Sequence, residues 1–155
     1  MKKILLTLLI LSFTGISVFA NSTDFYEPST EAKLEYNQGI DYYKVGQYDR
    51  AMASFRQAIE LDANYIDAYY NLGSILEYLK QDEAALAIFK QIIVRNPNDY
   101  ESVYKAASLS NKLGQIEKAK SYLSLIPAES GIYSKAQALA NSMSTDMQTI
   151  KAKED

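Results

Sequence analysis

The sequence predicts an all-α protein: a right-handed α-solenoid of three helix pairs, closed by one longer helix. Two observations predict it. Small and bulky apolar residues recur every 34 positions through the middle of the chain, and an apolar stripe of helical spacing runs through the C-terminal region. A third observation sets the N-terminus apart, because its basic start and long apolar run are typical of an export signal.

The repeat becomes visible when the chain is compared with itself after a shift of 34 residues. Each unit then shows two short amphipathic helices, with small residues where the helices come close and bulky residues filling the space between units. The matching sets are Tyr36, Tyr70 and Tyr104; Gly39, Gly73 and Ala107; Ala51, Ala85 and Ala119; Phe55, Phe89 and Leu123; and Ala58, Ile92 and Ile126. We assign the units to residues 32–65, 66–99 and 100–129.

The turns inside the units follow the same spacing. Gly46 and Gly114 fall between the two helices of their units, where the residue after a helix commonly has a positive φ. Lys80 stands at this position in the second unit, so that turn has to form without glycine. Pro97 follows the second helix of the second unit and is expected to stop it.

The pattern resembles the tetratricopeptide repeat family over residues 32–126. The first unit matches at Gly39, Tyr42, Tyr48, Ala51, Phe55 and Ala58, and the second at Tyr69, Leu72, Gly73, Ala85, Phe89 and Pro97. The first unit has Ala63 where proline is usual. The third keeps Ala119 and Leu123 but has Ala107 in place of glycine. The resemblance is specific for the fold and says little about function.

The resemblance also implies a protein-binding surface, because the first helices of such units line the concave side of the solenoid. The inward positions are the second, fifth, ninth and twelfth of each unit. In this chain they are Lys33, Tyr36, Ile40 and Tyr43; Asp67, Tyr70, Ser74 and Glu77; and Glu101, Tyr104, Ser108 and Asn111. Three tyrosines in register and mostly acidic charges suit an extended or helical partner with apolar anchors and neutral or basic character. The tyrosines are equally explained as packing between neighbouring helices.

Some members of the family hold acidic C-terminal tails with a cluster of Lys, Arg and Asn. That cluster requires basic residues at Tyr36 and Glu101 and an asparagine at Ile40. Only Asn71 and Lys105 fit it. We therefore do not expect this chain to bind acidic tails in that way.

Residues 130–155 are predicted to form a capping helix and tail, with Ser130 as the N-cap. Solenoids need such a terminal element to cover the last unit. The apolar positions lie on one helix face: Ile132, Ala136, Leu139, Met143, Met147 and Ile150. This stripe is longer than a repeat helix, so its far end either overhangs or pairs with another molecule.

The N-terminus is expected to be a signal peptide, residues 1–20, cleaved after Ala20. Lys2 and Lys3 precede an apolar run over residues 4–19, and small residues stand near the cut. Residues 21–31 are expected to be a flexible lead-in. This predicts an exported protein, periplasmic or otherwise secreted, without stable membrane insertion after cleavage. The alternative is an uncleaved membrane anchor.

The composition excludes several kinds of chemistry. Without Cys or His the chain has no disulfide, no thiolate metal site and no His-based catalytic triad. The net charge of −3 becomes −5 when Lys2 and Lys3 leave with the signal, which disfavours nucleic acid as a partner. We expect no cofactor, no metal and no enzymatic activity. An enzyme using carboxylates alone would have to use Glu60 with Asp62 or Asp82 with Glu83, which lie at helix ends.

Together these features predict a scaffold or adaptor of the cell envelope that binds another protein, or a peptide segment of one, in its concave groove. The alternative is a self-associating component of an envelope complex. It would use the capping helix or the open edge of the first unit, where no upstream helix covers Leu34.

Overall fold

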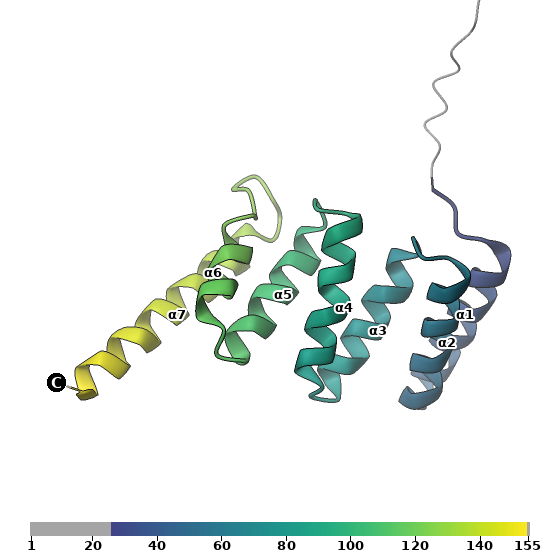
Figure 1. Cartoon of the computed structure of the whole chain (residues 1–155), viewed down its shortest axis with the longest axis horizontal. Helices are drawn as coiled ribbons and strands as arrows, with labels where there is room; N and C mark the ends of the chain where they lie inside the picture. The colour runs from purple at the N-terminus through teal and green to yellow at the C-terminus, as the bar shows by residue number, and fades with distance from the viewer. Residues whose placement is uncertain (1–25, 155) are drawn as a thin grey trace, which may run out of the picture.

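The computed structural model describes residues 26–154, with side chains as far as Thr145. This part of the chain forms seven α-helices and no strand: α1 (Thr30–Lys44), α2 (Tyr48–Leu61), α3 (Ile66–Tyr78), α4 (Asp82–Arg95), α5 (Tyr100–Lys112), α6 (Ile116–Leu123) and α7 (Tyr133–Glu154). The helices lie side by side in chain order along the long axis of the molecule (Figure 1). The expected fold class, an α-solenoid of three helix pairs with a C-terminal helix, is confirmed.

The first helix begins slightly earlier than the predicted start of the first unit. Ser29 is its N-cap, and the Ser29 hydroxyl accepts the backbone N–H of Ala32 at 3.2 Å. The last residues of the expected lead-in therefore belong to a helix cap and a first helical turn. The predicted signal peptide and the first part of the lead-in lie outside the described residues.

The turns within the helix pairs share one backbone conformation. Gly46 and Gly114 have φ values of 74° and 72°, and Lys80 adopts nearly the same conformation with a φ of 61°. The left-handed region suits glycine because it has no Cβ, whereas other L-residues are strained there. Lys80 thus holds a strained conformation that the repeat imposes on it.

Replacing Lys80 with glycine is expected to stabilise the protein. The Lys80 side chain is exposed and makes no hydrogen bond or ion pair among the described residues, so the substitution removes strain without losing a contact. We expect a gain of about 1 kcal/mol in the free energy of unfolding, measured by chemical denaturation. Gly46→Lys is the matched reverse change and should lose a similar amount; equal stability of both variants and the wild type would contradict a strained turn.

Small residues allow the two helices of each pair to approach closely, as predicted. A Cβ on Gly39 would lie 2.7 Å from the ring of Phe55, and one on Gly73 would lie 3.1 Å from the ring of Phe89. Ala107 takes this position in the third pair and is fully buried. Both phenylalanine rings are fully buried as well. The repeated small residue and the repeated bulky residue are thus two halves of one contact.

The helix pairs are joined by a continuous apolar core. One buried cluster runs from α2 through α3 and α4 to α5 and contains Phe55, Leu72, Ile75, Phe89 and Leu109. Each unit therefore buries its apolar face against its neighbour, as stacked repeats do. Pro97 comes two residues after the end of α4, as expected of a residue that stops a helix.

The C-terminal part departs from the repeat. Helix α6 is only 8 residues long and ends at Leu123, whereas α2 and α4 have 14 residues each. Ser130 is not the N-cap of the last helix, which begins three residues later at Tyr133. Instead, Ser130 accepts the N–H of Ile132 through its hydroxyl and the N–H of Tyr133 through its carbonyl oxygen in a tight turn.

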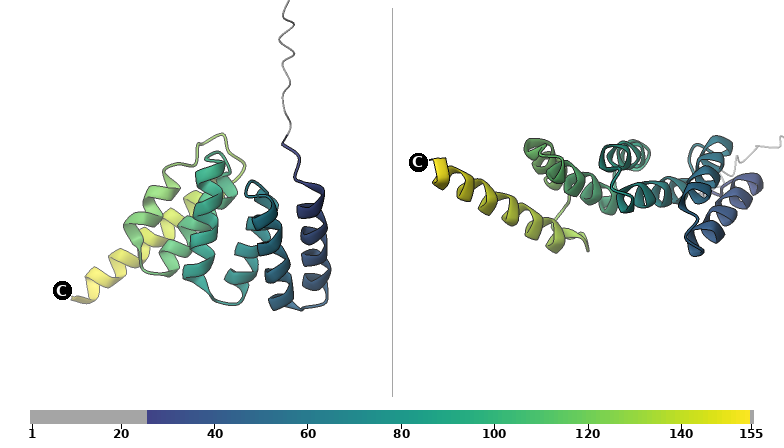
Figure 2. Two further views of the ribbon diagram at one scale, coloured as in Figure 1. Left: turned by 45° about the vertical axis from the view of Figure 1, so that its right-hand side comes forward. Right: turned by 90° about the horizontal axis from the view of Figure 1, so that it is seen from below.

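Helix α7 covers the third unit through the first part of its apolar stripe. Ile132 and Ala136 are buried in one cluster with Val103 of α5 and Ile126, and Met143 is buried too. Beyond this contact α7 runs away from the other helices toward the C-terminus (Figure 2). The side chains of Met147 and Ile150 lie outside those described. None of the described helices is long and apolar enough to span a membrane.

Candidate protein-binding surface

The twelve residues predicted to line the concave side come in fours from α1, α3 and α5. None of them is fully buried. Tyr43 and Asp67 are exposed, and the other ten are half-buried. The first helices of the three units therefore offer a mixed surface of tyrosine, serine and charged side chains. Nothing in the structure tests whether a partner uses this surface, so its role stays a prediction.

Tyr36 is packed within the scaffold as well as partly accessible. Its ring lies 4.8 Å from the ring of Tyr65 and 5.6 Å from that of Phe55. Its hydroxyl accepts a 2.9 Å hydrogen bond from the side-chain amide of Asn71 in the next unit. Burial and the nearby charge of Asp67 raise the pKa of Tyr36 above its usual value.

Tyr70 repeats this arrangement one unit later. Its ring meets the ring of Phe89 edge-on at 5.7 Å, and both Tyr36 and Tyr70 pack against the main core cluster. Tyr104 packs against the cluster that α7 completes. The tyrosine row is therefore part of the packing between helices. The binding interpretation now depends on the faces that these rings leave accessible.

An ion pair between units lies beside Tyr70. The Lys105 ammonium donates to a Glu77 carboxylate oxygen at 2.8 Å, and the two side chains are 27% and 28% exposed. Burial alone would lower the pKa of Lys105, but the hydrogen bond and the charge of Glu77 outweigh burial and raise it. Burial and the charge of Glu101 raise the pKa of Tyr70. Lys105 is thus charged, and its ammonium group is already paired with Glu77.

Asn71 and Lys105 were not among the residues predicted to line the surface. Both stand at the sixth position of their units, one residue after a tyrosine of the row. In the structure this position meets the preceding unit, through Tyr36 in one case and Glu77 in the other. The 34-residue alignment does bring these sixth positions into register. They carry asparagine in two units and lysine in the third, so no single residue type marks them.

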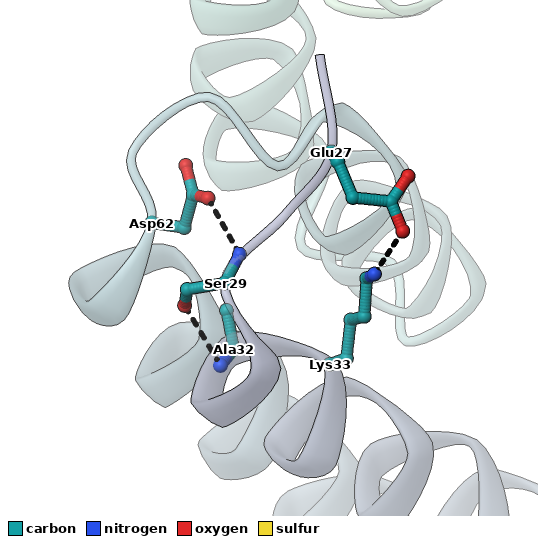
Figure 3. Close-up of polar contacts among 5 residues, drawn as sticks. All are labelled: Glu27, Ser29, Ala32, Lys33 and Asp62. Atoms are coloured by element: carbon teal, nitrogen blue, oxygen red, sulfur yellow. Dashed lines mark hydrogen bonds and ion pairs between the residues drawn. The ribbon is translucent and has the colours of Figure 1, made fainter. Parts of the chain in front are cut away.

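The segment before α1 is attached to the first unit, and we call residues 26–29 the N-terminal strap (Figure 3). The backbone N–H of Ser29 donates to Asp62 at 3.1 Å, and the hydroxyl of Tyr26 also hydrogen-bonds to Asp62. Glu27 forms an ion pair with Lys33, one of the predicted surface residues. The strap therefore binds the turn after α2 and neutralises the basic residue at the first-unit end of the surface.

Asp62 is the centre of the strap's attachment. Burial alone would raise the pKa of Asp62, but hydrogen bonds from the backbone N–H of Asn64, the hydroxyl of Tyr26 and the backbone N–H of Ser29 outweigh it and lower the pKa. Partial burial and the bond to Asp62 raise the pKa of Tyr26. The ionised carboxylate is thus the state that the strap stabilises.

Removing this carboxylate should loosen the strap in a pH-dependent way. A lowered pKa in the folded state means that the contribution of Asp62 to stability is complete above about pH 4 and is lost as the pH falls through the folded pKa. Asp62→Ala is expected to lower the melting temperature at pH 7 and to speed hydrogen exchange at the Ser29 amide.

Melting from pH 7 to pH 3 checks this expectation, since the difference between Asp62→Ala and the wild type should shrink toward acid. Glu60→Ala, at an exposed position of α2, serves as the control and should change neither property appreciably. A difference that stays constant down to pH 3 would contradict a role for the ionised carboxylate.

The four acidic residues that a carboxylate-only enzyme would have to use differ in their contacts. Asp82 is paired with Lys112 at 2.6 Å, and Asp62 holds the strap. Glu60 and Glu83 are exposed. Two of the four acids therefore make contacts between segments distant in sequence. Among the described residues no group of three acidic side chains is placed to hold a metal ion.

Comparisons with known proteins agree with the fold. Sequence models described as TPR repeat and tetratricopeptide repeat match residues 39–79 and 67–99. A 52-residue stretch is 33% identical to the Photosystem I assembly protein Ycf3 of Acaryochloris marina (strain MBIC 11017). That stretch covers 34% of this chain and 31% of Ycf3, so less than a third of that relative is matched.

Two similar solved structures contain bound peptides. The first TPR of Spaghetti (RPAP3), bound to the HSP90 peptide SRMEEVD, has a TM-score of 0.62 and 19% identity, covering 75% of this chain and 95% of that one. The Yersinia enterocolitica type III secretion chaperone SycD, in complex with a peptide of the translocator YopD, has a TM-score of 0.60 and 21% identity, covering 82% and 97%. At these identities the likeness concerns the fold.

The stacked helix pairs and the row of tyrosines along α1, α3 and α5 define a helical-repeat protein of the α-solenoid class. The matching repeat models place it more narrowly. Residues 39–99 of this chain match the tetratricopeptide repeat family. Both matched models describe the repeat itself.

Proposed function

We propose that this protein is an interaction scaffold or adaptor of the cell envelope, which binds one partner segment along α1, α3 and α5. The observation that carries the proposal is the row of partly accessible tyrosines, with serine and charged side chains between them, on three consecutive first helices. Tyrosine offers a large contact area at low conformational cost. Support comes from RPAP3 and SycD, whose structures have the same fold and contain bound peptides.

The test has to block the surface without unpacking the scaffold. Tyr→Ala variants are unsuitable because Tyr36 and Tyr70 pack against Phe55 and Phe89. Ser74→Tyr with Ser108→Tyr adds bulk at two half-buried surface positions and removes no packed ring. The matched control is Ala87→Tyr with Ala138→Tyr, at exposed positions of α4 and α7.

The mature chain and both variants are used as baits in crosslinking capture from an envelope fraction, after circular dichroism has shown equal helix content. We expect one protein to be captured by the wild type and the control but lost by the Ser74→Tyr/Ser108→Tyr variant. Equal capture by all three would place binding elsewhere on the molecule and would overturn the proposed surface.

The proposed location is the periplasm, reached through cleavage after Ala20. Its support is the basic start and apolar run of residues 1–20. We expect the protein in the periplasmic fraction to begin with Asn21 by N-terminal sequencing. A chain beginning at Met1 and recovered with membranes would contradict cleavage and favour an anchor.

Self-association is a second candidate, favoured by the first unit's open edge. Leu34 is 70% exposed, whereas its equivalents Ala68 and Ser102 are fully buried. Leu34 lines a shallow hollow of about 600 Å³ together with Leu61, which is 44% exposed. Sedimentation velocity over a range of concentrations should show assembly of the wild type but not of Leu34→Ser; a concentration-independent monomer would exclude this candidate.

A further inference from the structure

Some charged residues along the proposed surface are paired within the chain and others are unpaired. The sign of the unpaired charges identifies the kind of partner. The two basic residues of the surface are already paired within the chain. Lys33 forms an ion pair with Glu27 of the strap, and Lys105 forms one with Glu77. An acidic partner segment would have to break one of these pairs before it gained an ion pair of its own.

Two acidic residues of the same surface have no such partner. Asp67 on α3 is exposed and Glu101 on α5 is half-buried, and neither side chain has an ion pair or hydrogen bond within residues 26–145. Glu101 lies near enough to Lys105 to influence its pKa, but the Lys105 ammonium donates its hydrogen bond to Glu77. The unpaired charge of the surface is therefore negative.

Both carboxylates belong to the surroundings of the tyrosine row. Together with burial, the nearby negative charge of Asp67 raises the pKa of Tyr36, and that of Glu101 raises the pKa of Tyr70. Asp67 and Glu101 hold the same position in successive units, on either side of Tyr70 in the sequence. Tyr70 follows Asp67 by three residues on α3, so a partly accessible tyrosine shares its helix face with one of the two unpaired carboxylates. Such a surface is complementary to a segment with basic side chains around an apolar one.

The strap limits where such a segment can lie. Its Glu27 forms an ion pair with Lys33, so the start of α1 on this surface is occupied by the chain itself. The part of the surface that the strap leaves free therefore begins beyond Lys33 and includes the residues on α3 and α5.

We infer that the partner is a basic peptide segment, bound across α3 and α5, with cationic side chains toward Asp67 and Glu101 and an apolar side chain toward Tyr70. This inference rests on the proposed function, because it names the partner of the same surface. Its basis is charge complementarity: each cation of the surface has an intramolecular partner, and these two carboxylates have none.

The probe is a library of random 12-residue peptides displayed on phage, selected against the mature chain. We expect the enriched peptides to carry net positive charge around an aliphatic or aromatic residue. Synthetic copies of them should bind Asp67→Asn/Glu101→Gln about five- to tenfold more weakly than the wild type, since exposed ion pairs contribute modestly. The same difference should diminish at high salt, because ions screen exposed charges.

Glu60→Gln/Glu83→Gln is the matched control, because it also removes two negative charges, but at exposed positions of α2 and α4. We expect its affinity to equal that of the wild type. Amide NMR shifts on adding a selected peptide should concentrate on α3 and α5. Shifts centred on residues 26–33 would show that the peptide displaces the strap, and would overturn the placement.

The outcomes separate this inference from the function on which it rests. Enriched peptides that are neutral or acidic, or equal weakening in the control variant, would overturn the basic partner while leaving the surface in place. Peptides that bind Ser74→Tyr/Ser108→Tyr as well as they bind the wild type, or no enrichment at all, would overturn the proposed surface and the inference with it.

Discussion

Phe89→Ala is expected to destabilise the protein by about 3–5 kcal/mol, the usual cost of removing a fully buried aromatic ring. The ring is completely buried and meets the ring of Tyr70 edge-on at 5.7 Å. The backbone at Gly73 approaches it so closely that a Cβ there would lie 3.1 Å away. Helices packed this tightly cannot collapse into the space that the ring leaves, so a cavity should remain. The loss is a large part of the total stability of a small domain.

Chemical denaturation followed by circular dichroism measures this loss. Phe89→Leu keeps most of the volume and should cost less than about 1.5 kcal/mol. Lys90→Ala, at the next and exposed position of the same helix, should change little. If Phe89→Ala lost under about 1 kcal/mol, the second unit would not be packed around this ring, and Gly73 would not be required for the ring to fit.

Deletion of residues 131–155 is expected to remove at least about 3 kcal/mol of stability, the cost of exposing two large apolar side chains, and to cause aggregation or a broadened unfolding transition. The deletion takes away Ile132, Ala136 and Met143, all of them buried, and uncovers Val103 and Ile126. Leu109 of α5 lies in the core cluster shared with the earlier helices, so the loss should begin in the third unit.

A shorter deletion separates capping from chain length. Removing residues 146–155 keeps every buried residue of α7 that the structure describes, and the melting temperature should stay near that of the wild type. Thermal unfolding and light scattering of the two truncated chains give the comparison. An unchanged melting transition after deletion of residues 131–155 would contradict the capping role of α7.

The repeat was predictable because its contacts are local and recur at a fixed spacing. The 34-residue comparison identified the small and the bulky positions but assigned the bulky ones to the space between units. The structure shows that Phe55 and Phe89 also pack within their own units, against Gly39 and Gly73. The strained turn at Lys80 was also located in advance, since the glycines of the other units show the conformation that the position requires. The early end of α6 and the start of α7 at Tyr133 were not predicted, because the repeat stops there and gives no register.

The candidate surface was predictable only in part. The sequence located the tyrosine row, and the structure added that Tyr36 and Tyr70 are packed against the core. The pairing of Lys105 with Glu77 joins residues 28 positions apart. Such a pair depends on the rotation of one unit against the next, which local periodicity does not specify. The sequence could count the charges but not tell which of them stay unpaired.

By itself the sequence determined the helical repeat, the order of the units and the positions where helices approach closely, because spacing and side-chain size decide these within each unit. Only the tertiary structure decided that the strap binds Asp62, 33 residues from Ser29, and that Glu27 neutralises Lys33. These contacts require two separate segments to meet with polar groups in matching geometry. Their free energy depends on distances and burial across units, which no single stretch of the sequence contains.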